Sequence, residues 1–401
     1  MINELSNIAA RKGLIHTQIF NSNLVNLTSY NMTLIGKQEL YNLKNETATS
    51  LLTILQDHVA LMAYGKEASH LLSQELLPFC KSGVTVFAGL GGNKTSSDFN
   101  LTPNASVYGL YIFPGTGQRL PDNQFVEVGS YNASEIISNA VDWWHQIEYT
   151  NFSFEGTSII GNVRNISSPA VLTQGRYTYA GSTNWMTNNV VYDGVQVAQE
   201  EVEIQYYYVT QVINSQTYYW FLSFTQHTTE GYSGFTVPVG NRQETSYATP
   251  VGTSEYLNAE TSSYPGQQLF SFGPTGSQSC VQSVSYSLSG GSGGSSSASV
   301  AYTVNPSSIS YSLNGNPSGG WLNWTHSFCG GQQSNTLYDL EPSAVIEINP
   351  TLSGGVIPML VYNTYTASYQ LTSNGAILPF ASVSAPTMSF QTTVYTNSVS
   401  I

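Results

Sequence analysis

Basic side chains are missing from the second part of this 401-residue chain. From Gln243 to Ile401 there is no lysine and no arginine, and His326 is the only side chain that can carry a positive charge. This part therefore has almost no ion pairs available, and it has no lysine to protect exposed sheet edges from pairing with other strands. Its edges must be closed by the fold itself or must meet other subunits.

Charge is scarce along the whole chain, at 9% of residues against about 25% in an ordinary soluble protein. The apolar fraction is 41% and the aromatic fraction 12%, enough to build large cores, so low charge does not indicate disorder here. The formal net charge of -13 rests on 24 carboxylates. A chain with so few titratable groups loses few ion pairs on acidification, which favours an acidic, extracellular or surface setting.

The sequence lacks the features typical of nucleic-acid binding, membrane helices and metal sites. No basic patch is available to neutralise phosphates, so we expect no nucleic acid. No run approaches the roughly 20 apolar residues of a membrane helix. No spacing of Cys and His predicts a metal site, and we expect no cofactor. Met1–Glu4 contains no apolar signal-peptide core, which fits either a leader already removed or a virion component released by lysis.

The chain has three cysteines, Cys80, Cys280 and Cys329. Cys280 and Cys329 flank one β-rich segment, so we expect a disulfide between them, with Cys80 as the odd thiol. The alternative is three small buried residues without a bond.

Acceptor sites for N-linked glycans, Asn-x-Ser/Thr, are concentrated before residue 166. They are Asn26, Asn31, Asn45, Asn93, Asn100, Asn104, Asn132, Asn151, Asn165 and Asn323. A following proline cancels three later candidates, Asn305, Asn316 and Asn349. This asymmetry favours an outward, glycan-bearing N-terminal part and a C-terminal part packed against something, although proline can simply mark turns there.

The first part of the chain has helical periodicity over residues 38–77. Apolar residues recur at spacings of three and four from Leu51 to Met62 and from Leu71 to Leu77, and Pro78 stops the pattern. We expect a pair of packed helices. The last convincing helix spans residues 134–148.

From Val84 onward the apolar period is mostly two, as in β-strands. The clearest hairpin pairs Val202–Val212 with Thr217–Thr225, both rich in Tyr, Trp, Phe and Val. Asn314-Gly315 and Asn374-Gly375 are signals for tight hairpin turns.

These patterns predict a mainly β fold, with antiparallel β-sandwich or jelly-roll domains preceded by a small helical N-terminal region. The length predicts two or three domains. We divide the chain into a helical region at 1–83, a β-rich domain with one helix at 84–280, and a C-terminal sandwich-like domain at 281–401.

Carboxylates on one strand face are the main catalytic candidates. Glu201, Glu203 and Gln205 alternate along a predicted strand, with neighbouring side chains about 7 Å apart. Two carboxylates at that distance can divide acid and base roles in glycoside cleavage, and a carboxyl beside an amide can activate water for peptide cleavage in acid. Glu255 and Glu260 form the other close acidic pair of the β-rich part. The alternative is a solvated sheet face without catalysis.

In composition the chain is similar to the thermopsin-type acid peptidases of thermophilic archaea and to the glutamic peptidases, which are β-rich, Ser/Thr/Tyr-rich secreted proteins. This resemblance implies an acid-active hydrolase. No motif of these families matches residue by residue, so no catalytic role transfers.

The absence of a catalytic constellation favours a non-enzymatic protein instead. The chain resembles, as a class, the exterior structural glycoproteins of thermoacidophilic archaea. That resemblance implies a self-assembling component of a cell-surface layer, extracellular filament or virion shell or spike, with further copies or other surface subunits as partners. A secreted acid-active hydrolase with paired carboxylates is the alternative. A carbohydrate-binding adhesin is the second alternative, with Trp321, Trp324 and Tyr338 beside asparagines as glycan contacts.

Overall fold

The structure is a computed structural model. It describes residues 32–36, 40, 47–57, 59–76, 80–90, 107–113, 123–130, 178–183, 186–259, 266–281, 284–290, 298–304, 309–330, 334–348, 356–374 and 379–397.

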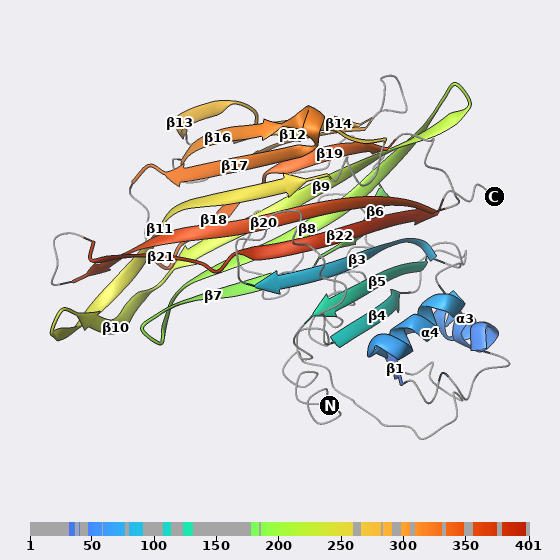
Figure 1. Cartoon of the computed structure of the whole chain (residues 1–401), viewed down its shortest axis with the longest axis horizontal. Coiled ribbons are helices and arrows are strands. Elements are labelled where there is room, and N and C mark those ends of the chain that lie inside the picture. Colours follow the sequence, from blue (N-terminus) through green and yellow to red (C-terminus); the bar gives the residue numbers. More distant parts are fainter. Residues whose placement is uncertain are drawn as a thin grey trace.

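A sheet of 13 strands, called the large sheet below, forms one layer of the molecule (Figure 1). Its hydrogen-bonded order is β1 (Met32–Ile35), β2 (Ala60–Tyr64), β4 (Val107–Phe113), β5 (Asn123–Ser130), β3 (Cys80–Leu90), β22 (Met388–Asn397), β20 (Val356–Ser373), β11 (Arg242–Asn258), β17 (Trp321–Phe328), β16 (Ile309–Asn316) and β13 (Ser277–Val281). In addition, β10 (Ser233–Val239) pairs with β11, and β21 (Ala381–Ser384) pairs with β20. Among these described strands, only the β1–β2 and β3–β5 pairs are parallel.

A second sheet of seven strands, the small sheet, forms the opposite layer. Its order is β12 (Gln267–Gly273), β19 (Ser343–Ile348), β9 (Gln216–Gly231), β8 (Val195–Ile213) and β6 (Thr178–Ser182), with β18 (Leu337–Leu340) paired to β9 and β7 (Met186–Tyr192) paired to β8. A separate hairpin of β14 (Val284–Gly290) and β15 (Ala298–Val304) contributes Val284 and Leu288 to an apolar cluster on the outer side of the small sheet.

The main core lies between the two sheets because alternate residues of each strand point inward. Val202 and Ile204 of β8 and Phe221 of β9 pack with Leu257 of β11 and Trp324 of β17, and all five are almost fully buried. The alternation that predicted strands therefore also defines which side chains form this core.

The sequence prediction of a mainly β, sandwich-like fold with a small helical N-terminal region is confirmed. In the described part of this region, α3 (Thr47–Gln56) and α4 (Lys66–Leu76) pack on β2. None of the helices in the described residues is long and apolar enough to span a membrane.

The expected helix pair over residues 38–77 needs a correction, because strand β2 separates α3 from α4. Val59 to Met62 belong to a short apolar run that is buried throughout, and such a run fits a buried strand as well as a helix. Gly65, with a φ of 94°, follows the strand and turns the chain into α4. The expected helix at 134–148 lies outside the described residues.

The hairpin predicted around residue 214 is confirmed, and it is longer than expected. Strands β8 and β9 pair from Ala198–Gly231 to Ile213–Gln216. Asn214 and Ser215 both have positive φ, at 51° and 65°, as the two central residues of a type I′ turn require.

The turn predicted at Asn314-Gly315 was wrong, because both residues belong to β16. The chain reverses three residues later at the 3-10 turn Pro317–Gly319, where the Asn316 side chain accepts a hydrogen bond from the Gly319 N–H. Proline pre-sets this turn at its first position.

Strands from all three predicted segments pair within the large sheet: β3 lies between β5 and β22, and β11 between β20 and β17. The boundaries at residues 83 and 280 stay a prediction.

Gly231 lies where β9 of the small sheet comes close to β11 of the large sheet, and we expect alanine there to destabilise the fold. An added Cβ would lie 2.3 Å from the backbone oxygen of Ala248, so backbone must shift, at a cost of about 1–3 kcal/mol. Urea unfolding of Gly231→Ala should show a lower midpoint. Gly319→Ala is the matched control, because its Cβ would meet only the rotatable Asn316 side chain; equal midpoints for the two variants would contradict this account.

Candidate functional site

The densest group of ionisable side chains in the described residues is centred on His227 of β9, inside the sandwich. Its Nε2 lies 2.8 Å from Oε1 of Glu200 on β8, and its Nδ1 lies 2.7 Å from Oε1 of Glu255 on β11. Carboxylates only accept hydrogen bonds, so His227 donates from both nitrogens and is an imidazolium. Glu255 comes from the opposite sheet, so this histidine is a charged link between the two layers.

The group continues beyond both carboxylates. The second oxygen of Glu255 accepts from Nδ1 of His326 on β17 at 2.8 Å. The second oxygen of Glu200 accepts from the side-chain amide of Asn188 on β7 at 3.0 Å. Glu200, His227, Glu255 and His326 are each at most 1% exposed. We call these four side chains the buried ionic chain.

Two neutral links join the same two sheets on either side of His227, from β9 to β20. Thr225 of β9 is 3.1 Å from the hydroxyl of Tyr365 on β20, and Thr229 donates to the hydroxyl of Tyr369 at 2.5 Å. The Tyr369 hydroxyl donates in turn to the backbone oxygen of Gln199. Polar groups therefore cross the sandwich at three successive inward positions of β9.

This polar layer separates two apolar clusters of the sandwich. Along the inner face of β8, Glu200 stands between Ala198, which packs in one cluster, and Val202, which packs in the other. A polar layer is costly to bury unless every member is paired. It therefore favours one register between the two sheets, because a shifted register would leave charges without partners.

The pKa values reflect this pairing. Burial alone would lower the pKa of His227, but its hydrogen bonds to Glu200 and Glu255 outweigh burial and raise the pKa to about 9 from an ordinary 6.5. Burial alone would raise the pKa of Glu255, but the charge of His326 and the hydrogen bond with His227 lower it to about 2 from an ordinary 4.5.

Two further carboxyls with shifted pKa values are associated with β18. Asp339 lies opposite Thr228 of β9 in the strand register, and Glu341 follows the strand. Burial raises the pKa of both carboxyls above their ordinary values, and the neighbouring Asp339 charge raises that of Glu341 further. These two groups take up protons on folding in mildly acidic solution.

The predicted candidates Glu201, Glu203 and Gln205 lie together along the other face of β8, away from the buried ionic chain. Glu201 is half-buried and accepts hydrogen bonds from Thr187 and Gln199. Glu203 is buried and accepts from the Gln205 amide at 3.1 Å. Their catalytic role stays a prediction.

Of the second predicted pair, Glu255 belongs to the buried ionic chain, and Glu260 lies outside the described residues. Sequence reasoning missed Glu200, His227 and His326. The alternation of side chains along a strand could have identified Glu200. It lies on the same strand face as Val202, Ile204 and Tyr206, which are core residues.

Of the predicted glycan contacts, Trp324 and Tyr338 are buried. The Trp324 indole N–H donates to the backbone oxygen of Pro274 at 2.9 Å. Trp321 is half-buried and stacks on Tyr256. Only Trp321 of the three remains at the surface.

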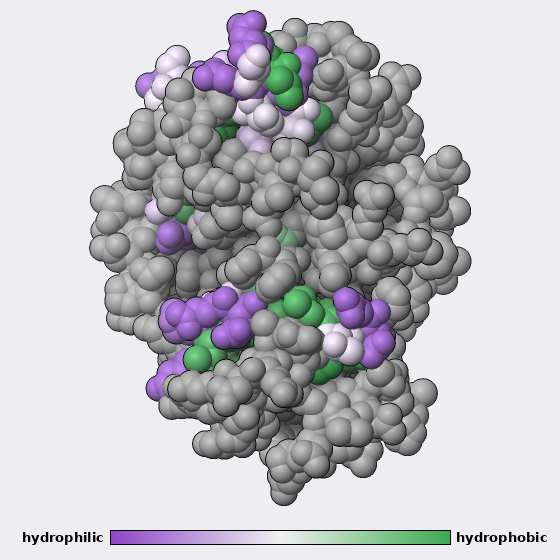
Figure 2. Space-filling model, turned by 90° about the vertical axis from the view of Figure 1, so that its right-hand side faces the viewer, coloured by the Kyte–Doolittle hydropathy of each residue, from purple (hydrophilic) through white to green (hydrophobic). Residues whose placement is uncertain are grey.

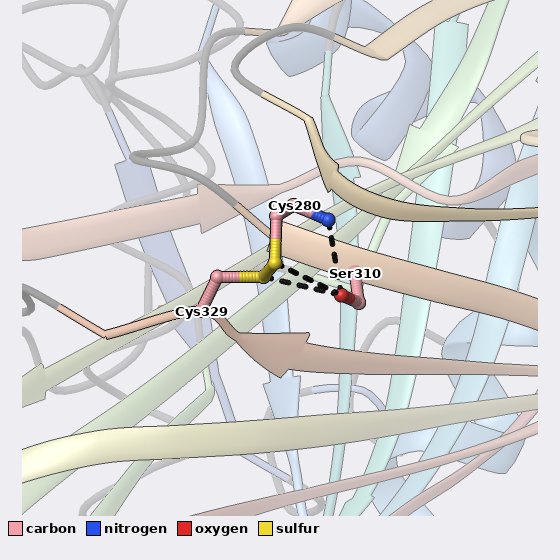
Figure 3. Close-up of a disulfide and its surroundings, with 3 residues drawn as sticks. All are labelled: Cys280, Ser310 and Cys329. Carbon is pink, nitrogen blue, oxygen red and sulfur yellow. Dashed lines mark hydrogen bonds between the residues drawn. A yellow bond between two sulfur atoms is a disulfide. The ribbon is translucent and has the colours of Figure 1, made fainter.

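The predicted disulfide between Cys280 and Cys329 is present, with Cα atoms 5.5 Å apart (Figure 3). It joins the edge strand β13 to the end of β17. The Ser310 hydroxyl of β16 lies 3.1 Å from the Cys329 sulfur and accepts from the Cys280 N–H at 3.1 Å. Cys80 is a buried thiol outside this disulfide, and burial raises its pKa to about 12, so it is not a reactive thiolate.

Asn323 is the one predicted glycan acceptor within the described residues, and it lies half-buried on β17. The other nine lie outside them. Within the described part of the chain, no group of three or more His, Cys, Asp or Glu side chains is arranged to hold a metal ion.

The outer face of the large sheet carries hydroxyls and amides in place of charges. Directly paired residues share a face, so the strand register identifies the residues that point away from the core. On β16, β17, β11 and β20 they include Ser310, Ser312, Asn314, Asn316, Trp321, Asn323, Thr325, Ser327, Ser254, Tyr256, Asn258, Thr364, Thr366, Ser368 and Gln370, which are exposed or half-buried, and Tyr362 opposite Asn258, which is buried. We call this surface the charge-free face.

No protein-family model and no curated protein sequence matches the chain. Among solved structures it is similar to Clostridium perfringens delta-toxin, with 8% identity and a TM-score of 0.29 over 54% of this chain and 95% of that chain. It is also similar to a structure titled "Pore forming protein", with 7% identity and a TM-score of 0.32 over 54% of this chain and 94% of that chain. Likenesses this distant carry no argument about function.

The stability of the protein should be greatest near pH 4.5, because it falls below this pH as Glu255 is protonated and above it as Asp339 and Glu341 ionise. The raised pKa of His227 gives stabilisation that is complete below 6.5 and lost as pH rises through about 9. The lowered pKa of Glu255 gives stabilisation that is complete above 4.5 and lost as pH falls through about 2. Because the pKa values of Asp339 and Glu341 are raised, the protein gains stability as pH falls toward the ordinary pKa values of these two groups. Urea unfolding across pH 2–10 measures this profile, and a maximum above pH 8 would contradict it.

Replacing His227 with glutamine should destabilise the protein by about 3–5 kcal/mol, because Glu200 and Glu255 would remain buried without their shared cation. The change should also reduce the loss of stability between pH 6.5 and 9, and the part that remains comes from Glu341, whose pKa is also raised into this range. Chemical denaturation at pH 6 and pH 9 tests both effects. His70→Gln, on the exposed side of α4, is the matched control and should change neither; equal behaviour of the two variants would refute the role of His227.

Proposed function

We propose that the protein is a non-enzymatic, exterior structural protein that packs with further copies into a cell-surface layer, an extracellular filament or a virion shell or spike. The observation that carries this proposal is the charge-free face. Hydroxyl and amide surfaces can pack against another subunit without the cost of desolvating charge. A face of this kind on four neighbouring strands supports a contact with a second copy.

The position of the buried ionic chain inside the sandwich argues against a catalytic role for its side chains. A catalytic acid or base must come within hydrogen-bond reach of its substrate. Glu200, His227 and Glu255 are sealed between the two sheets, and their hydrogen bonds are used in joining the layers. The hydrolase alternative therefore gains no support from this group.

The exposed apolar side chains do not offer a competing contact surface. The large ones in the described residues are Leu34, Val191, Val212, Val251 and Phe270, and each lies on a different strand. On the side of the molecule shown in Figure 2, hydrophobic and hydrophilic described residues are interspersed. Single exposed apolar residues are normal on soluble proteins and need no partner.

An acidic exterior setting agrees with the ionisable groups. Folding binds protons at His227, Asp339 and Glu341, since their pKa values are raised in the folded protein. A protein that gains stability on mild acidification is suited to an acidic environment outside a cell.

Assembly through the charge-free face predicts that one charge placed there weakens self-association. Ser327 is exposed at one end of the face. In Ser327→Arg a guanidinium would be desolvated against a face without carboxylates, which costs several kcal/mol for an unpaired ion. Light scattering with negative-stain images at pH 4 and pH 7 should show ordered oligomers or filaments for the unchanged protein, and association at least about tenfold weaker for the variant.

Gln216→Arg is the matched control, because it adds the same charge at the exposed end of the β8–β9 hairpin. It should assemble like the unchanged protein. A clean monomer of the unchanged protein at both pH values would overturn the structural role and make hydrolysis of casein and polysaccharide at pH 3 the next assay. Equal weakening by both variants would show only an effect of net charge.

A further inference from the structure

Tyr256 and Trp321 form an aromatic pair on the charge-free face. Their ring centroids are 6.3 Å apart and the planes are inclined by 28°, so the rings are stacked. Tyr256 belongs to β11 and Trp321 to β17, and both side chains are half-buried. Both residues therefore keep some exposed surface, unlike the buried Trp324 three residues further along β17.

Carboxamides and hydroxyls lie beside these rings in the strand register. Trp321 is directly opposite Asn258 on one side and Asn316 on the other. Tyr256 is directly opposite Asn323 on one side and Thr364 on the other. Each ring thus has neutral groups that donate and accept hydrogen bonds within one strand spacing, about 4.8 Å.

The aromatic pair Tyr218–Trp220 on the small sheet provides an internal comparison. Its rings are stacked at 5.9 Å. Trp220, however, is 1% exposed, its indole N–H donates to Glu347 at 2.9 Å, and it packs in the apolar cluster that includes Val284. That pair packs in the core, and the Glu347 carboxyl group is beside it. The Tyr256–Trp321 pair has neither property.

We propose that the Tyr256–Trp321 pair, with the surrounding asparagines, is a binding site for a neutral carbohydrate. The apolar C–H face of a pyranose ring packs on an aromatic ring, while a few fixed polar groups orient the hydroxyls. An anionic ligand is disfavoured because the charge-free face offers no cation. This inference goes beyond the structural role, and the site can act in a monomer as well as in an assembly.

The proposed carbohydrate site and Ser327, the position changed in the assembly test, lie at different ends of the charge-free face. Trp321 and Ser327 are six positions apart on β17, a distance of about 20 Å along a strand. The face therefore has room for a sugar at one end and for protein packing at the other. Ser327→Arg should leave carbohydrate binding unchanged, so failure of one proposal can be recognised without the other.

Two sources can supply a neutral carbohydrate: glycans on the Asn-x-Ser/Thr sites of a second copy, or a polysaccharide of another surface. The common chemistry is a pyranose chain without acidic groups. Protein made in a host without N-glycosylation separates them. If it binds a free neutral oligosaccharide, the site accepts an outside source; if only glycosylated protein self-associates and the same oligosaccharide competes, the glycans of a second copy are the ligand.

The test is titration of the full chain, at pH 5, with mannohexaose and cellohexaose as neutral probes and oligogalacturonate as the anionic probe, followed by calorimetry and tryptophan fluorescence. We expect binding of at least one neutral probe and none of the anionic probe. Trp321→Ala and Tyr256→Ala should each weaken binding at least tenfold. Tyr218→Ala, from the comparison pair, should bind like the unchanged protein.

Asn258→Ala keeps both rings and removes one carboxamide, so it tests the site if either ring variant fails to fold. It should weaken binding several-fold with unchanged urea unfolding. The proposal is overturned if neither neutral probe binds the unchanged protein, if the anionic probe binds equally well, or if folded Trp321→Ala and Asn258→Ala both bind like the unchanged protein.

Discussion

The two hydrogen bonds that the protonated His227 ring donates to Glu200 and Glu255 are the central interaction of the sandwich. It joins β9 of the small sheet to β11 of the large sheet through a fully buried cation and carboxylate. Replacing such a link with well-packed apolar residues is often neutral for stability, whereas breaking it leaves a charge buried and unpaired. The link therefore favours the observed register of the two sheets, because a shifted register would break these hydrogen bonds and leave buried charges unpaired.

Around the buried ionic chain, strands β11 and β17 place ionisable side chains inside the sandwich and neutral side chains on the outer surface. Three of the few ionisable groups on the core strands, Glu255, His227 and His326, are used inside the sandwich. The outward residues of the same strands β11 and β17 are neutral. The result is a fold that gains protons on folding and presents hydroxyls, amides and two half-buried rings, which agrees with a structural role and with recognition of neutral carbohydrate.

Much of the fold could be predicted from local pattern, and the ionic chain could not. Alternating apolar residues predicted β8 and β9, and Cys280 with Cys329 predicted their bond. The short apolar run at Ala60–Tyr64 was misread because helix and buried strand share that pattern. His227 meets residues that are 27 and 28 positions away on different strands, and no local periodicity encodes a contact across two sheets.

The protonation state of His227 tests the central claim most directly. Nitrogen-15 NMR of histidine-labelled protein, assigned with His227→Gln, distinguishes an imidazolium from either neutral tautomer. The account predicts that both ring nitrogens of His227 stay protonated from pH 5 to pH 8. A neutral His227 at pH 7.5, with one nitrogen unprotonated, would contradict a charged link between the sheets.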